Sequence, residues 1–86
     1  MNWIVRNNSL TKNISFNSQT ELAEFVLKIA KIADNMHHHP DYIISKCNQL
    51  EISLSTHDKN GITEKDHALA ERIEQEMVGF DVKQLK

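Results

Sequence analysis

The chain has 86 residues, of which 40% are hydrophobic and 26% charged, and its formal net charge at pH 7 is -2. This is typical of one soluble globular domain, so residues 1–86 are taken as a single domain whose small core makes self-association a reasonable expectation. The absence of a Lys/Arg cluster argues against nucleic acid and membrane surfaces as partners. No apolar run is long enough to span a bilayer. The single cysteine and the lack of a signal-peptide layout favour the cytoplasm.

The first predicted element is a β-hairpin over residues 3–16. Leu10, Ile14 and Phe16 alternate with polar residues, as expected for a strand with one buried face, and only Lys12 interrupts the pattern. Residues 7–9 have the composition of a turn, so residues 3–6 are expected to form the partner strand.

A helix is expected from about residue 19 to 37. Ser18, followed three residues later by Glu21, is a capping box. Apolar residues then recur at three- and four-residue steps: Leu22, Phe25, Val26, Ile29, Ile32, Ala33 and Met36. This stripe is wide enough to cover a sheet and to leave area for a partner.

Three consecutive histidines, His37-His38-His39, precede Pro40 at the end of this helix. Pro40 disfavours helical backbone at the residue before it, so the helix is expected to end near His37 or His38, with His39 extended. Imidazole titrates near neutral pH, and a helix C-terminus favours its protonated form. The position is therefore suited to general acid–base chemistry.

The next hairpin is expected to have strands over residues 42–46 and 50–57, joined by a turn at 47–49. From residue 50 the alternation is strict, with a core face of Leu50, Ile52, Leu54 and Thr56. The polar face consists of Glu51, Ser53, Ser55 and His57. His57 therefore ends the polar face of the second strand.

Residues 58–61 are expected to form a turn in which Gly61 is free to take positive φ. Thr63 and Asp66 mark the start of a second helix, and Gly79 is expected to cap its end. The apolar positions of this helix are Leu69, Ala70, Ile73 and Met77. The element order β-β-α-β-β-α predicts an α+β fold, in which two helices pack on one face of a four-stranded antiparallel sheet.

Asp66 falls on the buried stripe of the second helix. A buried carboxylate needs a partner, and a histidine would serve. An Asp at the third helical position also completes a capping box with Thr63. Both interpretations stay open on the sequence alone.

The adjacent histidines are also candidate metal ligands. Neighbouring helical residues point about 100° apart, so His37 and His38 cannot easily share an ion, whereas His37 and His39 could converge with His57. No Cys-x-x-Cys or His-Glu-x-x-His motif accompanies them, so we predict no metal. The simplest alternative is that these histidines only cap the helix in solvent.

Taken together, the spaced motifs resemble the pterin-4a-carbinolamine dehydratases. The family pattern is an acidic residue, three spacers, His-His-Pro, an aromatic residue, Thr-His at a strand end, then Gly and Asp. In this chain the pattern falls on Asp34, His38-His39-Pro40, Tyr42, Thr56-His57, Gly61 and Asp66, with Trp3 at the start of the first strand. The family's N-terminal helix is expected to be missing or reduced.

The resemblance implies a lyase that dehydrates 4a-hydroxytetrahydrobiopterin to quinonoid dihydropterin without a cofactor. It implies that His38 and His57 transfer protons, that His39 holds the pterin and that Asp66 supports the histidine cluster.

The implied substrate-binding set is Asp34, His39, Pro40 and Tyr42, with Asp34 placed to hydrogen-bond the polar edge of the ring. The interval from Pro40 to His57 is one residue longer than the family pattern. We expect the turn at 46–49 to absorb this residue, because a slip along the strand would turn His57 away.

The resemblance also implies a homodimer or homotetramer with a small-molecule pterin substrate. It supplies a second class of function, a dimerisation cofactor of the same fold with little activity. A metal-binding histidine protein is the third alternative.

Overall fold

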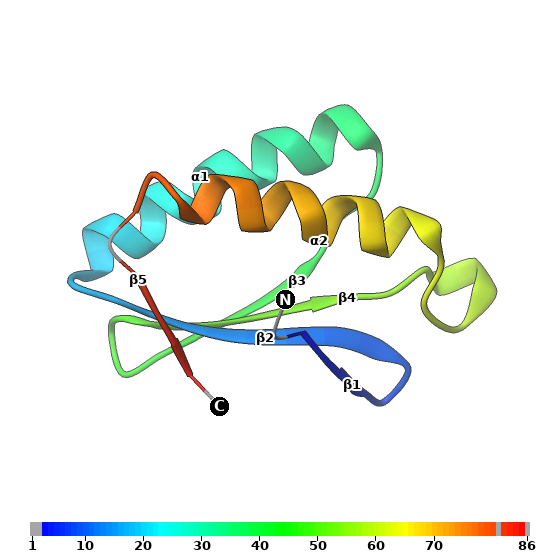
Figure 1. The fold of residues 1–86 in the computed structure, drawn as a ribbon, viewed down its shortest axis with the longest axis horizontal. Helices are drawn as coiled ribbons and strands as arrows, with labels where there is room; N and C mark the ends of the chain where they lie inside the picture. Colours follow the sequence, from blue (N-terminus) through cyan, green and yellow to red (C-terminus); the bar gives the residue numbers. More distant parts are fainter. Residues whose placement is uncertain (1–2, 81, 86) are drawn as a thin grey trace.

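The computed structural model describes residues 3–80 and 82–85, and its two helices cover one face of an antiparallel sheet (Figure 1). In chain order the elements are β1 (Ile4–Arg6), β2 (Ser9–Phe16), α1 (Gln19–Met36), β3 (Asp41–Ser45), β4 (Gln49–Leu54), the 3-10 helix η1 (His57–Lys59), α2 (Glu64–Met77) and β5 (Val82–Leu85). The strand order β1-β2-β4-β3 confirms the predicted α+β fold and its element order.

The sheet contains one strand that the sequence analysis did not predict. β5 pairs antiparallel with β2, from Phe16 opposite Val82 to Asn13 opposite Leu85. β1 pairs only with the first part of β2, at residues 9–11, and β4 occupies the opposite edge. The second part of the β2 edge is therefore left free for β5, whose four residues are too few to show a clear alternation.

The core lies between the sheet and the helices, and the predicted alternation of buried positions is confirmed. Its buried members come from β2, α1, β4 and α2: Leu10, Ile14, Phe16, Leu22, Phe25, Ile29, Leu50, Ile52, Leu54, Leu69, Ala70 and Ile73. Val26, Ile32 and Met36, which also belong to the predicted apolar stripe of α1, pack against this core as well. The stripe is therefore occupied by the protein's own core.

Lys12, which interrupts the alternation of β2, lies on the same buried face and is only 1% exposed. Its ammonium forms an ion pair with Glu74 of α2, and the Trp3 indole N–H donates to the same carboxylate at 3.1 Å. The ammonium also lies 5.6 Å from the centre of the Trp3 ring. A buried charge is tolerated here because its counter-charge reaches it from the helix above.

The ends of α1 follow the predicted signals. The Ser18 hydroxyl accepts a hydrogen bond from the Glu21 N–H at 3.1 Å, which is the N-cap half of the predicted capping box. The helix ends at Met36, and His37 takes a left-handed conformation with φ 53°. The His38 N–H then bonds the Ala33 carbonyl at 3.1 Å, which closes the helix and directs the next residues toward β3.

Two glycine predictions are wrong. Asn60, with φ 52°, takes the left-handed position expected of Gly61. Asn tolerates this region because its short polar side chain can hydrogen-bond the local backbone, which offsets the steric cost. At the end of α2, Val78 stays right-handed and Gly79 has no positive φ. After α2 the chain continues through backbone hydrogen bonds between residues three apart, such as the Phe80 N–H donating to the Met77 carbonyl at 3.1 Å. The helix therefore ends without a residue in the left-handed conformation.

The end of the second hairpin also differs from the prediction. β4 stops at Leu54 rather than reaching residue 57, and His57 begins η1. Thr56 makes an isolated bridge to Gly61, which closes the loop around η1. The β3–β4 register runs without interruption from Asp41 opposite Ser53 to Ser45 opposite Gln49, so residues 46–48 form the whole connection and no bulge is present in this ladder.

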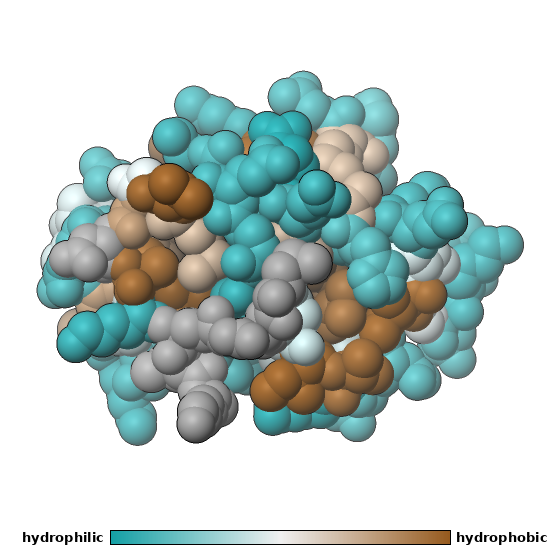
Figure 2. Space-filling model, viewed as in Figure 1, coloured by the Kyte–Doolittle hydropathy of each residue, from teal (hydrophilic) through white to brown (hydrophobic). Residues whose placement is uncertain are grey.

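On the face seen in Figure 2, hydrophobic residues form separate patches between hydrophilic ones. In β1, Ile4 and Val5 are 46% and 66% exposed, and in β3, Ile43 and Ile44 are 57% and 50% exposed. Among the described residues, no helix is both long and apolar enough to cross a membrane.

Candidate active site

A cleft of about 410 Å³ lies where the segment after α1 meets η1 and the first turn of α2. Its volume falls within the range of small-molecule sites. The cleft is lined by His37, His38, His39, Pro40, Asp41, Ser55, Thr56, His57, Asp58 and Lys65. The chain reversal through β3 and β4 therefore brings His57 to the same cleft as the histidines that follow α1.

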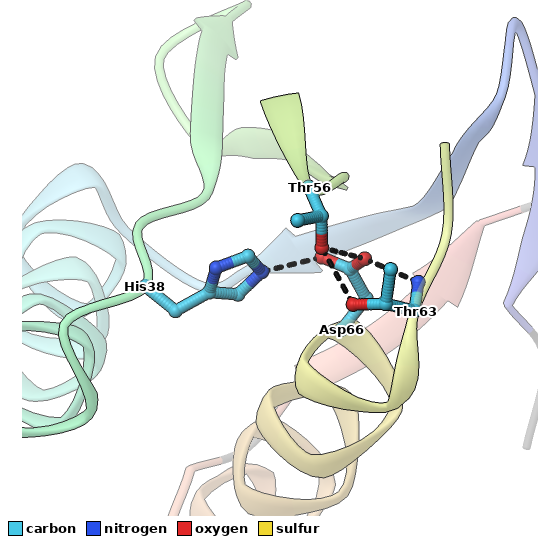
Figure 3. A network of polar contacts seen from close by, with 4 residues as sticks. All are labelled: His38, Thr56, Thr63 and Asp66. Carbon is cyan, nitrogen blue, oxygen red and sulfur yellow. Dashed lines mark hydrogen bonds and ion pairs between the residues drawn. The ribbon is translucent and has the colours of Figure 1, made fainter. Parts of the chain in front are cut away.

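His38 reaches the buried Asp66 of α2 across this end of the molecule (Figure 3). Its Nε2 lies 2.6 Å from Asp66 Oδ1. The other carboxylate oxygen, Oδ2, accepts from the Thr63 N–H and from the Thr56 hydroxyl, each at 2.9 Å. Asp66 thus caps α2 and contacts a histidine at once, so the two interpretations open on the sequence both describe it.

Opposing effects act on the pKa of the Asp66 carboxyl. Burial alone raises this pKa, but the hydrogen bonds from His38, the Thr63 backbone and Thr56 outweigh it and hold the pKa below its ordinary value of 3.8. The carboxylate is therefore ionised at neutral pH. An ionised carboxylate can only accept hydrogen bonds, so the proton between it and His38 lies on Nε2.

The implied substrate-binding residues separate into two groups. His39 and Pro40 line the cleft, but Asp34 and Tyr42 are not among its lining residues. Asp34 instead contacts His39, with Oδ1 2.8 Å from Nε2, and both side chains are mostly exposed. Tyr42 packs against the core from β3.

The Tyr42 hydroxyl is buried and has no hydrogen-bond partner within the described part of the chain. Burial and the nearby Asp34 carboxylate raise the pKa of Tyr42 to about 12, so the phenol stays neutral. Its environment is that of a core residue next to the site.

Sequence reasoning gave Thr56 no role in the site: it placed this residue on the core face of the strand and, beside His57, in the family pattern. It is 5% exposed, and its hydroxyl contacts both Asp66 and Thr63. A buried hydroxyl on an otherwise apolar face needs a partner, and this signal was present in the sequence. Asp41, Asp58 and Lys65 also line the cleft, and no motif marked them.

Within residues 3–80 and 82–85, no group of three or more His, Cys, Asp and Glu side chains is arranged to hold a metal ion. His57 is exposed at the start of η1, while His38 is turned toward Asp66.

Comparison with known proteins identifies the family. The sequence profile described as pterin 4 alpha carbinolamine dehydratase matches residues 1–76. The chain belongs to the pterin-4a-carbinolamine dehydratase family. A relative from Sulfolobus acidocaldarius is 46% identical over 71 residues, which are 83% of this chain and 77% of that protein. One from Herpetosiphon aurantiacus is 42% identical over 72 residues, which are 84% of this chain and 74% of that protein. Both are provisionally named pterin-4-alpha-carbinolamine dehydratases.

Two solved structures share the family fold. A transcriptional coactivator/pterin dehydratase from Brucella melitensis superposes with a TM-score of 0.78 at 24% identity, covering 86% of this chain and 78% of that one. A pterin dehydratase-like protein identified as a RuBisCO assembly factor in the alpha-carboxysome gives 0.70 at 19% identity, covering 88% and 89%. At these identities the likeness concerns the fold alone.

Proposed function

We propose that this protein is a lyase that dehydrates 4a-hydroxytetrahydrobiopterin to quinonoid dihydropterin by histidine acid–base catalysis. Family membership supports the pterin substrate class. The observation that carries the chemistry is that His38, His39 and His57, which come from two separate segments, line one cleft. If the histidines after α1 only capped that helix, His57 from the separate segment η1 would not be needed beside them.

The reaction needs a proton donor for the oxygen that leaves C4a and a proton acceptor for the hydrogen on N5. The C4a–O bond breaks and the oxygen takes a proton, so that water leaves. N5 loses its proton, and its electron pair forms the C4a=N5 double bond. His38 and His57 are the proposed proton-transfer residues, since imidazole can act in either direction near neutral pH.

The remaining site residues hold the substrate and the histidines. His39 and Pro40 are proposed to contact the pterin ring from the wall of the cleft. Asp66 supports His38 through its carboxylate, and Asp34 orients His39 through the contact between them. Tyr42 is proposed to support this wall from the core side of β3.

Stopped-flow dehydration of synthetic 4a-carbinolamine tests this function. His38→Ala and His57→Ala should each slow turnover about 10²-fold or more if these residues transfer protons. His67→Ala is the matched control, because His67 is an exposed histidine of α2 away from the cleft lining, and it should leave turnover unchanged. A wild-type rate equal to that of buffer would contradict the proposal and leave an interaction module of the same fold as the alternative.

We further propose that residues 1–86 act as one domain that self-associates as a homodimer or homotetramer in the cytoplasm. β3 supports this proposal, because it ends the sheet order and exposes Ile43 and Ile44. A sheet edge with exposed apolar side chains and no proline is a ready template for strand pairing.

A further inference from the structure

The buried hydroxyl of Thr56 lies at the centre of the polar network in Figure 3. It is 2.9 Å from Asp66 Oδ2 and 2.6 Å from the Thr63 hydroxyl. A hydroxyl has one proton to donate, and an ionised carboxylate can only accept. Thr56 therefore donates to Asp66, and the Thr63 hydroxyl donates to Thr56.

This arrangement fixes the orientation of the Asp66 carboxylate. Oδ2 is held by two donors, the Thr56 hydroxyl and the Thr63 N–H, and this leaves Oδ1 directed at His38 Nε2 at a distance of 2.6 Å. The donors come from two different segments, so the carboxylate cannot rotate without breaking one of them.

The carboxylate in turn decides which nitrogen of His38 is free. Nε2 carries the proton that it donates to Asp66, and Nδ1 lies on the side of the ring away from Asp66 (Figure 3). Nδ1 makes no hydrogen bond with any other described residue. Since His38 lines the cleft and Asp66 does not, Nδ1 is the ring nitrogen left to exchange a proton there.

The backbone of Thr56 adds a second constraint. Its N–H donates to the Gly61 carbonyl at 2.8 Å, which closes the loop that carries His57. The same residue thus connects the carboxylate behind His38 with the loop that presents the second histidine.

We propose that Thr56 is a positioning residue that acts through Asp66 to hold the His38 ring with Nδ1 as its proton-exchanging nitrogen. The inference rests on the proposed dehydratase function, but the orientation of His38 can be measured without turnover. Thr56→Val removes the hydroxyl at nearly constant shape, and Thr56→Ser retains it.

The decisive measurement is the ¹H–¹⁵N signal of the His38 imidazole. A buried Nε2–H bonded to a carboxylate is shielded from exchange, so the wild type should show a downfield proton correlated with Nε2. The signal should disappear in Thr56→Val and return in Thr56→Ser. Thr20→Val, the same substitution at an exposed position of α1, should leave it unchanged, and backbone amide spectra report whether each variant is folded.

Kinetics then relate this orientation to catalysis. We expect kcat of Thr56→Val to fall roughly 10- to 100-fold with little change in KM, and Thr56→Ser to recover most of the loss. Persistence of the Nε2–H signal in Thr56→Val, its absence from the wild type, or an unchanged kcat after its loss would each overturn the proposal. A wild type without activity would defeat the proposed function, while the imidazole spectra would still show whether Thr56 holds His38.

Discussion

At the scale of single residues, Asp66 shows how one side chain can complete a helix cap and serve a site. Its position three residues after Thr63, the N-cap of α2, is enough for its carboxylate to complete the capping box. The contact with His38 joins segments 28 residues apart, and no local pattern specifies it. The helix N-terminus also favours the negative charge that His38 contacts.

Replacement of Asp66 by Asn should lower stability in a pH-dependent way. Because the pKa of Asp66 is lower in the folded state, its contribution is complete above the ordinary value of 3.8 and is lost as pH falls through the folded pKa. At pH 7 we expect Asp66→Asn to cost about 2 kcal/mol of unfolding free energy, as for hydrogen bonds to a buried charge. Urea titrations of both proteins at pH 7, 4 and 3 measure this.

The difference between the two proteins should shrink as the solution is acidified below pH 4. A constant difference across this range would show that the charge of Asp66 is not what stabilises the fold. Asp58→Asn, at an exposed position of η1, is the matched control and should change stability little at either end of the range.

At the scale of elements, α2 is held on the sheet by a charged contact as well as by apolar packing. Lys12 of β2 and Glu74 of α2 form an ion pair whose lysine side chain is fully buried and whose glutamate side chain is 26% exposed. The Trp3 indole bonds the same carboxylate and so attaches the start of the chain to α2. Lys12 interrupts the apolar pattern of β2, but its position is explained once Glu74 of α2 is seen to pair with it.

Glu74→Gln should destabilise the protein more than Lys12→Met. Glu74→Gln leaves the buried Lys12 ammonium without its counter-charge, which lowers the free energy of unfolding by roughly 3 kcal/mol after allowance for the partial exposure of Glu74. Lys12→Met replaces that ammonium with an apolar side chain of similar length, which is often nearly neutral. Chemical unfolding of both single variants and of the double variant measures the difference.

The double variant Lys12→Met/Glu74→Gln should be more stable than Glu74→Gln alone, because no buried charge is left unpaired. Equal losses for both single variants, with additive effects in the double variant, would contradict this account of the pair.

At the scale of the whole molecule, most of the exposed large apolar side chains lie on the edge strands β1 and β3 rather than on the helices. The apolar stripe of α1 that could have met a partner packs into the core, with Leu27 its exposed neighbour at 55%. β3 instead presents a terminal strand with two exposed isoleucines. Self-association through β3 would extend the sheet from one copy into the next.

Ile43→Lys should weaken self-association, because a lysine on an edge strand opposes strand pairing. We expect the wild type to behave as a dimer or larger in size-exclusion chromatography with light scattering, and the variant to shift to the monomer. Val78→Lys, at an apolar position that is 87% exposed at the end of α2, should leave the assembly unchanged. A monomeric wild type, or loss of assembly only in Val78→Lys, would contradict the use of this edge.

The local signals of the chain determined most of its elements. Ser18 with Glu21 marks the start of α1, Pro40 marks its end, and the alternation of Leu50, Ile52 and Leu54 marks β4. Each of these depends on neighbours a few residues away, and for this reason it can be read without a structure. The misplaced glycine conformations and the end of β4 concern loop geometry, where Asn and Gly can exchange roles.

The tertiary structure alone decided the contacts between distant segments. The pairing of β5 with β2, the burial of Lys12 under Glu74 and the link from Thr56 through Asp66 to His38 all join residues from different elements. Their physical basis is the need of buried charges and backbone groups for partners, and the chain must be folded before it is known which partners are within reach.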